Sequence, residues 1–102
     1  MNLYMVYRLD RTDGQAPAIR EAVRPAHRAY MDRFSARVRL GGPVLDAHGQ
    51  GCGGLMVIEA ENEDEVRAMV QDDPFEQAGL SAHIDIRPFR WQTKRPADLP
   101  PL

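Results

Sequence analysis

The pattern of apolar positions over residues 2–9 predicts a strand. Leu3 and Met5 fall on one side of an extended chain and Tyr4 and Val6 on the other, so both sides are apolar. A short segment of this kind is typical of a strand that is buried on both faces. The polar residues that follow include Asp, Thr and Gly, which favour a turn and end this first element.

From Ala16 onward the apolar residues recur at intervals of three and four, which is the period of an amphipathic helix. They are Ile19, Val23, Ala26 or His27, Tyr30 or Met31, and Phe34. Pro25 lies inside this helix, so the helix either restarts there or carries a kink, because proline lacks an amide hydrogen and crowds the preceding turn. In both cases His27 lies just after the irregularity and on the apolar side of the helix.

A β-hairpin is expected in the middle of the chain. Residues 38–45 and 55–59 read as strands, and the segment 46–51 between them is rich in turn formers. Pro43 interrupts the first of these strands. Because proline cannot donate to a neighbouring strand, we expect it at an edge or a bulge of the sheet.

A second helix is expected over residues 62–72. Asn62 serves as its N-cap and Glu65 follows three residues later, which is the capping-box spacing. Its apolar stripe consists of Val66, Met69 and Val70. Pro74 ends this helix, and the segment after it is expected to be irregular or a single turn.

Residues 83–91 alternate again and predict a fourth strand with a break at Pro88. Residues 92–102 contain three prolines and few apolar anchors, so we expect an extended tail there. The chain is therefore divided into an α+β domain over residues 1–91 and a proline-rich tail over residues 92–102.

The predicted order of elements is βαββαβ, the ferredoxin-like plan, in which two helices cover one face of a four-stranded antiparallel sheet. Residues on both sides of the strands are apolar, yet the chain offers no third layer to cover the second face. A second copy of the sheet is the simplest cover. We therefore expect a homodimer packed sheet to sheet.

The composition argues against several classes of protein. The net charge is -2, so no overall positive field attracts nucleic acid. The single Cys52 cannot form an intramolecular disulfide, which favours a cytoplasmic setting. No apolar run is long enough to span a membrane, and the first ten residues lack the pattern of a signal peptide, so neither export nor membrane insertion is expected.

His27 and Asp73 are the candidate pair for chemistry. His27 follows Val23 by four residues and Asp73 follows Met69 by four, so both are expected on inward faces of neighbouring helices. A carboxylate at a helix C-terminus is unfavourable by about 0.3 to 1 kcal/mol, and a nearby imidazole would offset this. The alternative is purely structural: Asp73 caps a turn and His27 fills core space.

Several short motifs, in this order and spacing, resemble those of the YCII-related family. They are Arg24-Pro25-Ala26-His27 followed by Tyr30, then Leu40-Gly41-Gly42-Pro43, Asp72-Asp73-Pro74-Phe75, Ala78-Gly79-Leu80 and Ile84-Asp85-Ile86-Arg87-Pro88-Phe89. The resemblance runs from about Tyr4 to Trp91. It implies a dimeric α+β barrel of ferredoxin-like subunits, with a cleft lined by a histidine and an aspartate that match His27 and Asp73. One characterised member of the family is a dehydrochlorinase of a chlorinated hydroxyhydroquinone.

Five further residues are candidates for substrate binding. Arg24 is a candidate for an anionic group of the substrate, with a solvated arginine as the alternative. Gly42 and Pro43 would shape the floor of the cleft, or form a bulge in the sheet. Tyr7 and Tyr30 would each supply a hydroxyl, or pack in the core. The three histidines are too scattered for a metal site, and none is expected.

Two functional hypotheses follow. The first is a cofactor-independent enzyme, a lyase, isomerase or dehydrochlorinase of a small aromatic or carbonyl compound, with His27 as general acid/base and Asp73 orienting it. No cofactor is expected, because neither a phosphate-binding glycine loop before a helix nor a nicotinamide fingerprint occurs. The second is a non-catalytic dimeric module that binds a small molecule or another protein.

Overall fold

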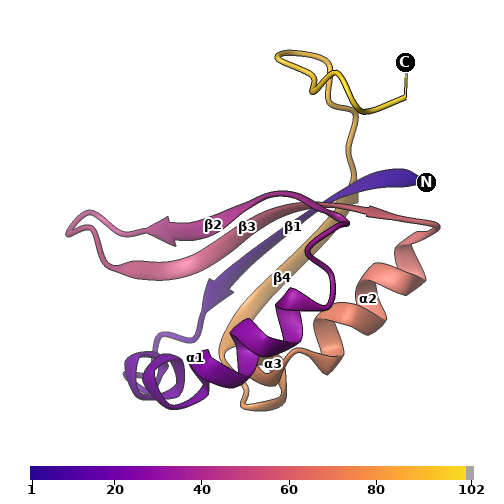
Figure 1. Cartoon of the computed structure of the whole chain (residues 1–102). Coiled ribbons are helices and arrows are strands. Elements are labelled where there is room, and N and C mark those ends of the chain that lie inside the picture. Colours follow the sequence, from indigo (N-terminus) through magenta and orange to yellow (C-terminus); the bar gives the residue numbers. More distant parts are fainter. Residues whose placement is uncertain (101–102) are drawn as a thin grey trace.

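The computed structural model describes residues 1–100, which form one four-stranded sheet with helices on one of its faces (Figure 1). The elements in chain order are β1 (Asn2–Asp10), α1 (Ala16–Asp32), β2 (Val38–Leu45), β3 (Gly51–Ala60), α2 (Glu63–Asp72), α3 (Pro74–Gln77) and β4 (Ser81–Pro88). The strand order is β2-β3-β1-β4, and every neighbouring pair is antiparallel. The predicted ferredoxin-like fold is confirmed, with the single turn α3 added after Pro74.

Strand β3 begins earlier than predicted. The expected strand covered residues 55–59, whereas β3 starts at Gly51 and includes Cys52, which the pattern had left in a loop. Glycines carry no side chain to reveal a period of two, so the pattern could not identify them as strand residues. Gly53 pairs with Leu9 of β1. A Cβ atom on Gly53 would lie 2.2 Å from the carbonyl oxygen of Arg8, so the close approach of these strands requires glycine there.

Strand β2 forms one edge of the sheet, and Pro43 lies on it as predicted. Its pairing with β3 shifts register twice, between Val38 and Leu40 and between Val44 and Leu45. Such shifts twist and bend an edge strand. In Figure 1 the β2–β3 hairpin extends well beyond the neighbouring ends of β1 and β4.

Helix α1 continues through Pro25 instead of restarting there. Figure 1 shows that its first turns run in a different direction from its last turns. A proline inside a helix removes one backbone hydrogen bond and pushes away the carbonyl four residues earlier, here that of Glu21. Of the two alternatives that the sequence left open, the kinked helix is the one observed.

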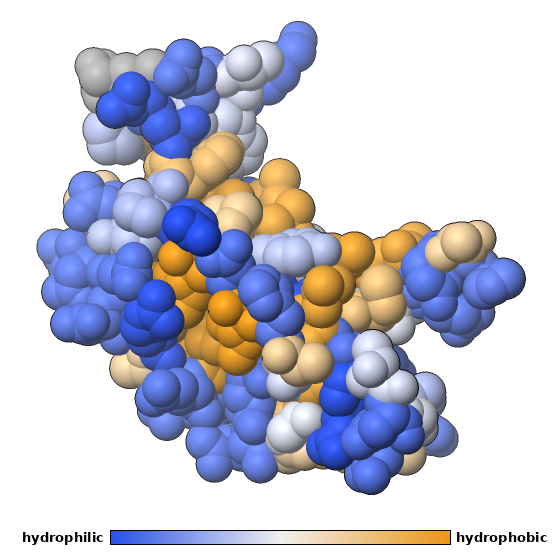
Figure 2. All heavy atoms as spheres, turned by 180° about the vertical axis from the view of Figure 1, so that it is seen from behind, coloured by the Kyte–Doolittle hydropathy of each residue, from blue (hydrophilic) through white to orange (hydrophobic). Residues whose placement is uncertain are grey.

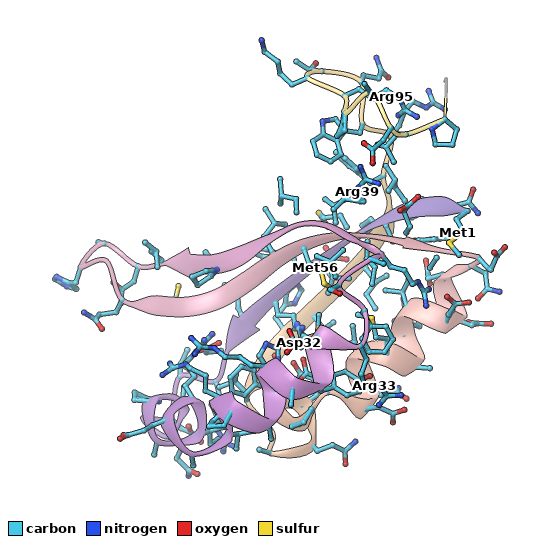
Figure 3. The ribbon with its side chains drawn as sticks, viewed as in Figure 1. Met1, Asp32, Arg33, Arg39, Met56 and Arg95 are labelled. Carbon is cyan, nitrogen blue, oxygen red and sulfur yellow. The ribbon has the colours of Figure 1, made fainter. Side chains whose placement is uncertain are left out.

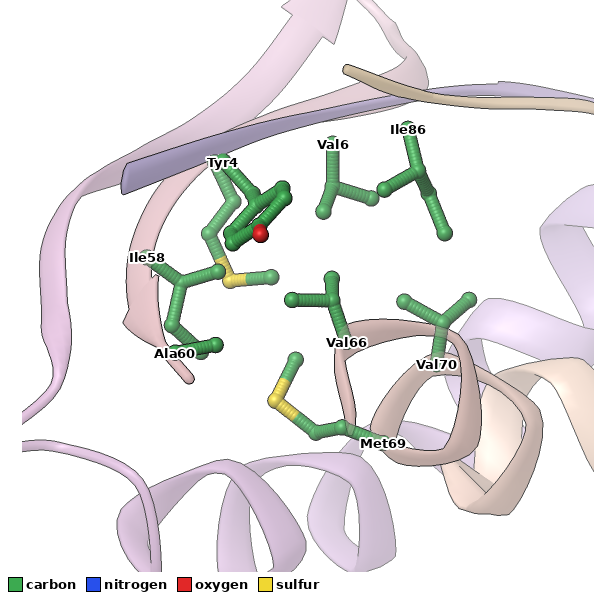
Figure 4. Packing of buried hydrophobic residues seen from close by; sticks show 9 residues of the cluster. Tyr4, Val6, Ile58, Ala60, Val66, Met69, Val70 and Ile86 are labelled. Carbon is green, nitrogen blue, oxygen red and sulfur yellow. The ribbon is translucent and has the colours of Figure 1, made fainter. Parts of the chain in front are cut away.

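The main core lies between α2 and the sheet. Figure 4 shows Tyr4, Val6 and Ile86 pointing from the strands toward Val66 and Val70 of α2. Their side chains are buried, as are those of Met56, Ile58, Ala60 and Met69 in the same cluster. The N-cap of α2 is formed as predicted, because the Asn62 side chain accepts a hydrogen bond of 2.9 Å from the amide of Glu65.

The two faces of the sheet differ. Met56 points from β3 toward the helices, whereas Arg39 lies on the other side, toward the tail (Figure 3). The tail over residues 92–102 was expected to be extended with few anchors, but its described part contains turns at residues 93–94 and 97–98. Asp98 pairs with Arg39 at 2.6 Å and Leu99 is buried, so contacts distant in sequence hold the tail. Pro101 and Leu102, which belong to the predicted tail, lie outside the described residues.

Candidate functional site

A cleft of about 1040 Å³ separates α1 from the sheet. Its walls include Arg24, His27 and Met31 of α1, and Val6 and Met56 of the strands. Glycines form much of the opposite side, namely Gly41, Gly42, Gly51, Gly53 and Gly54 of β2 and β3. Because glycine has no side chain, this part of the sheet cannot fill the space beneath the helix. The glycine-rich hairpin is therefore the local reason that a cleft exists.

The structure brings His27 and Asp73 together. The Nδ1 atom of His27 lies 2.8 Å from Oδ1 of Asp73. The Asp73 side chain is 1% exposed, whereas the His27 side chain is 23% exposed and lines the cleft. The Phe75 ring stacks on the imidazole, with the centroids 4.1 Å apart. Hydrogen bond and stacking together fix the orientation of the ring.

The Asp73 carboxylate has three partners. Besides His27, it accepts hydrogen bonds from the backbone amide of Phe75 at 2.9 Å and from Nη1 of Arg8 at 3.0 Å. Burial alone would raise the pKa of this carboxyl, but the hydrogen bonds from His27 and Phe75 and the charge of Arg8 outweigh it. The pKa of Asp73 is therefore held below its ordinary value.

Asp73 does not occupy the unfavourable position at a helix C-terminus that the sequence suggested. Its backbone is extended, so it ends α2 and also serves as the N-cap of α3. At a helix N-terminus a carboxylate accepts free backbone amides and is favoured by the helix dipole. Pro74 at the first position of α3 creates this change of direction.

The ionised carboxylate determines the tautomer of His27. A carboxylate can only accept a hydrogen bond, so the proton on the neutral imidazole lies on Nδ1. The other nitrogen, Nε2, has no hydrogen-bond partner within residues 1–100. An imidazole held in this way can accept a proton at Nε2 and later return it.

Arg8 is a residue of the candidate site that the sequence analysis missed. Its Nη1 atom contacts Asp73 at 3.0 Å and Glu76 at 2.9 Å, and Glu76 in turn accepts from the Ser81 hydroxyl at 2.7 Å. A signal was available, because Arg8 follows Tyr4 and Val6 on the helix-facing side of β1. A charged residue at an inward strand position requires a buried partner.

A second ion pair, between Arg20 and Asp10, also lines the cleft. Arg20 of α1 donates to both carboxylate oxygens of Asp10, at 2.6 and 2.8 Å, and to the carbonyl of Gly53 at 3.2 Å. The hydrogen bond to Asp10 is the main cause of a raised pKa of the Arg20 guanidinium. This pairing ties the first half of α1 to β1 and β3.

Three of the five predicted substrate-binding residues line the cleft, namely Arg24, Gly42 and Pro43. Tyr30 does not: its hydroxyl donates to the Met69 carbonyl at 2.6 Å, because it lies on the side of α1 that packs toward α2. Burial and the nearby carboxylates of the α2 end raise the pKa of its hydroxyl. Tyr7 is an odd-numbered residue of β1 and so points to the opposite face of the sheet, where its ring lies 6.3 Å from that of His83.

Two observations bear on other classes of site. Within residues 1–100, no group of three or more His, Cys, Asp and Glu side chains is arranged to hold a metal ion. No helix in this part of the chain is both long and apolar enough to cross a membrane.

The fold and cleft define a class, a ferredoxin-like α+β domain with a histidine–aspartate hydrogen bond between α1 and the junction of α2 and α3. The model of the YCII-related domain family matches residues 2–90, and the chain belongs to this family. Protein YciI of Escherichia coli O6:H1 is 30% identical over 96 residues, which cover 86% of this chain and 96% of that protein.

Solved structures have the same fold. The 5-chloro-2-hydroxyhydroquinone dehydrochlorinase TftG from Burkholderia phenoliruptrix AC1100, in complex with 2,5-dihydroxybenzoquinone, is 36% identical with a TM-score of 0.77. The match covers 88% of this chain and 93% of that one. SnoaB, a cofactor-independent oxygenase from Streptomyces nogalater, is 17% identical with a TM-score of 0.55 over 92% of this chain and 98% of its own, and supports the fold alone.

Proposed function

We propose that this protein is a cofactor-independent acid–base enzyme that acts on a small hydroxylated aromatic or carbonyl compound. In this proposal His27 is the catalytic acid/base and Asp73 is a positioning residue. The observation that carries it is the 2.8 Å contact between Nδ1 of His27 and the buried Asp73 carboxylate, at the wall of a cleft of about 1040 Å³. The likeness to TftG, which was solved with a quinone, supports the class of ligand.

The proposed chemistry is loss of a hydrogen halide from a halogenated dihydroxy aromatic ring, or an isomerisation by the same proton transfers. Nε2 of His27 takes the proton of one hydroxyl, and that oxygen becomes a carbonyl as a proton is added at the halogen-bearing carbon. Loss of a second hydroxyl proton then expels halide with its bonding electron pair. The net products are a quinone, one proton and one halide ion, so no external oxidant is required.

The site offers groups suited to such a ligand. The Phe75 ring and the glycine-lined wall allow a flat ring to approach closely, and Gly42 and Pro43 contribute to that wall. An imidazole whose orientation is fixed by a buried carboxylate is typical of acid–base catalysts. Arg24 would bind an anionic substituent at the mouth.

The test is a comparison of three proteins on a panel of hydroxylated and halogenated aromatic compounds, with release of halide and formation of quinone as readouts. Wild type is expected to turn over at least one compound. His27→Gln should lower kcat about 100-fold or more while the melting temperature and ligand affinity stay near wild type. His48→Gln removes an exposed histidine of the hairpin turn and serves as the matched control.

A His27→Gln variant with wild-type turnover would refute the catalytic role. Ligand binding without product formation in every protein would favour the non-catalytic binding module instead. A large loss of stability with unchanged ligand affinity would mean that His27 is structural.

We further propose that the protein is a cytoplasmic homodimer packed sheet to sheet. On the face of the sheet away from the helices, Leu3, Met5 and Leu9 are only half-buried and Leu55 is 38% exposed. Figure 2, a view from behind, has apolar atoms exposed across the middle of the molecule between the tail and the helices. An apolar surface of this kind favours association.

Light scattering of wild type and Leu55→Glu tests the dimer. Because Leu55 is exposed in the single chain, the variant should fold, and a buried charge in the interface should shift it to monomer. A monodisperse wild-type monomer at working concentration would refute the dimer.

A further inference from the structure

Three arginines follow one another at intervals of four along α1. Arg20, Arg24 and Arg28 all line the cleft. Residues four apart in a helix lie on one face, one above the other, about 6 Å apart along the axis. The sequence analysis named only Arg24 as a candidate for an anionic group, because the period of a single helix does not show that Arg20 and Arg28 line the same cleft.

The arginines of the cleft differ in how they are neutralised. Arg8 is paired with Asp73 and Glu76, and Arg20 with Asp10. Arg24 and Arg28, by contrast, are exposed and form no ion pair or side-chain hydrogen bond with another residue of 1–100.

The acidic residues at the mouth do not satisfy these two guanidinium groups. Asp46 and Glu21 also line the cleft. One carboxylate oxygen of Asp46 accepts from the backbone amides of His48 and Gln50, at 2.8 and 3.0 Å, which holds Asp46 in the hairpin turn. Glu21 is exposed and forms no ion pair within residues 1–100. Arg24 and Arg28 therefore have free donors beside His27.

We propose that Arg24 and Arg28 form a carboxylate-binding subsite, and that the preferred substrates are hydroxylated aromatic or carbonyl compounds that carry a carboxylate. Arginine matches a carboxylate because its planar guanidinium donates two parallel hydrogen bonds. Arg24 precedes His27 by three residues and so lies beside it on the helix, and Arg28 lines the same cleft. A carboxylate bound by the two arginines would leave the ring of the ligand within reach of Nε2 of His27. This inference rests on the proposed function and specifies its substrate class.

The probes are 2,5-dihydroxybenzoate and 2,5-dihydroxybenzamide, which share their hydroxyl groups and differ in charge. Calorimetric titration of wild type should give about tenfold tighter binding of the acid than of the amide. Arg24→Gln and Arg28→Gln should each reduce this preference, and the double variant should abolish it without changing the affinity for the amide. Added salt should weaken the binding of the acid but not that of the amide, because the subsite is exposed to solvent.

Arg67→Gln is the matched control, since it removes an exposed arginine of α2 that does not line the cleft. It should keep the full preference for the acid. An unchanged preference in the double variant would overturn the subsite, and so would equal affinity of wild type for acid and amide, or binding of neither. The test separates the two proposals: a preference that persists in His27→Gln, with no turnover by any protein, supports the subsite and refutes the enzyme.

Discussion

The helix-covered face of the sheet consists of two halves that are built differently. Beneath α2, side chains such as Val6, Ile58 and Val66 are at most 1% exposed and fill the space between helix and strands. Beneath α1, the hairpin presents glycines, and Leu45 remains 56% exposed. One face of the sheet therefore supports a packed core beneath α2 and an open cleft beneath α1, and the volume of the strand side chains decides which of the two forms.

The His27–Asp73 pair lies at the border of the two halves. His27 comes from the helix over the cleft, whereas Asp73 comes from the junction of α2 and α3 and is buried. The packed half thus holds the carboxylate away from water, and the open half gives the imidazole access to a ligand. Stability therefore comes mainly from the packed half, and the proposed chemistry belongs to the open half of the same face.

The largest expected effect is in the packed half. Ile58→Ala should lower the free energy of unfolding by about 4 kcal/mol, because Ile58 is fully buried and its removal leaves a cavity. Leu45→Ala, in the cleft, should change it by about 0.5 kcal/mol or less. Urea denaturation measures both. Equal losses would show that the two halves are packed alike and would remove the basis of this comparison.

An intermediate effect is expected at the border. Asp73→Asn should lower the free energy of unfolding by about 3 kcal/mol, because it leaves the partly buried Arg8 with one acidic partner fewer and removes the group that orients His27. Asp72→Asn, next to it in sequence but exposed, should cost little. Turnover should fall in Asp73→Asn alone. Similar losses of unfolding free energy in both variants would argue against a stabilising role of the contacts that Asp73 makes with Arg8 and His27.

The same residue predicts a dependence of stability on pH. The pKa of Asp73 is lower in the folded protein than its ordinary value of 3.8, so the unfolded chain binds a proton more readily. Its contribution is complete above pH 3.8 and is lost as the pH falls through the folded-state value. Wild type should therefore lose stability more steeply below pH 4 than Asp73→Asn. Parallel curves in acid denaturation experiments would contradict this.

The smallest of these effects is a difference in stability between substitutions at two adjacent glycines of β3. Gly53→Ala should destabilise by about 2 kcal/mol, because the new Cβ would lie 2.2 Å from the Arg8 carbonyl oxygen. At Gly54 the nearest atom to such a Cβ is 3.9 Å away, so Gly54→Ala should fold normally and reduce the volume of the cleft. Thermal unfolding and ligand affinity measure the two outcomes. A stable Gly53→Ala variant would show that β1 and β3 can separate at this point.

Much of the fold was predictable because its signals are local. The period of three and four identified α1 and α2, the Asn62 cap marked the start of α2, and Pro43 was expected at an edge. Where side chains are missing, the signal disappears, so the first residues of β3 were misassigned. The anchoring of the tail by Asp98 was missed for another reason, since its partner Arg39 is 59 residues away.

By itself, the sequence determined the order of elements and placed His27 and Asp73 on inward faces, because periodicity and capping act over a few residues. Only the tertiary structure decided which polar residues share the site. In the structure Arg8 pairs with Asp73, and Tyr7 and Tyr30 point away from the cleft. The three arginines of α1 lie across the cleft from the glycines of the hairpin. These placements depend on the packing of distant elements, which no short segment encodes.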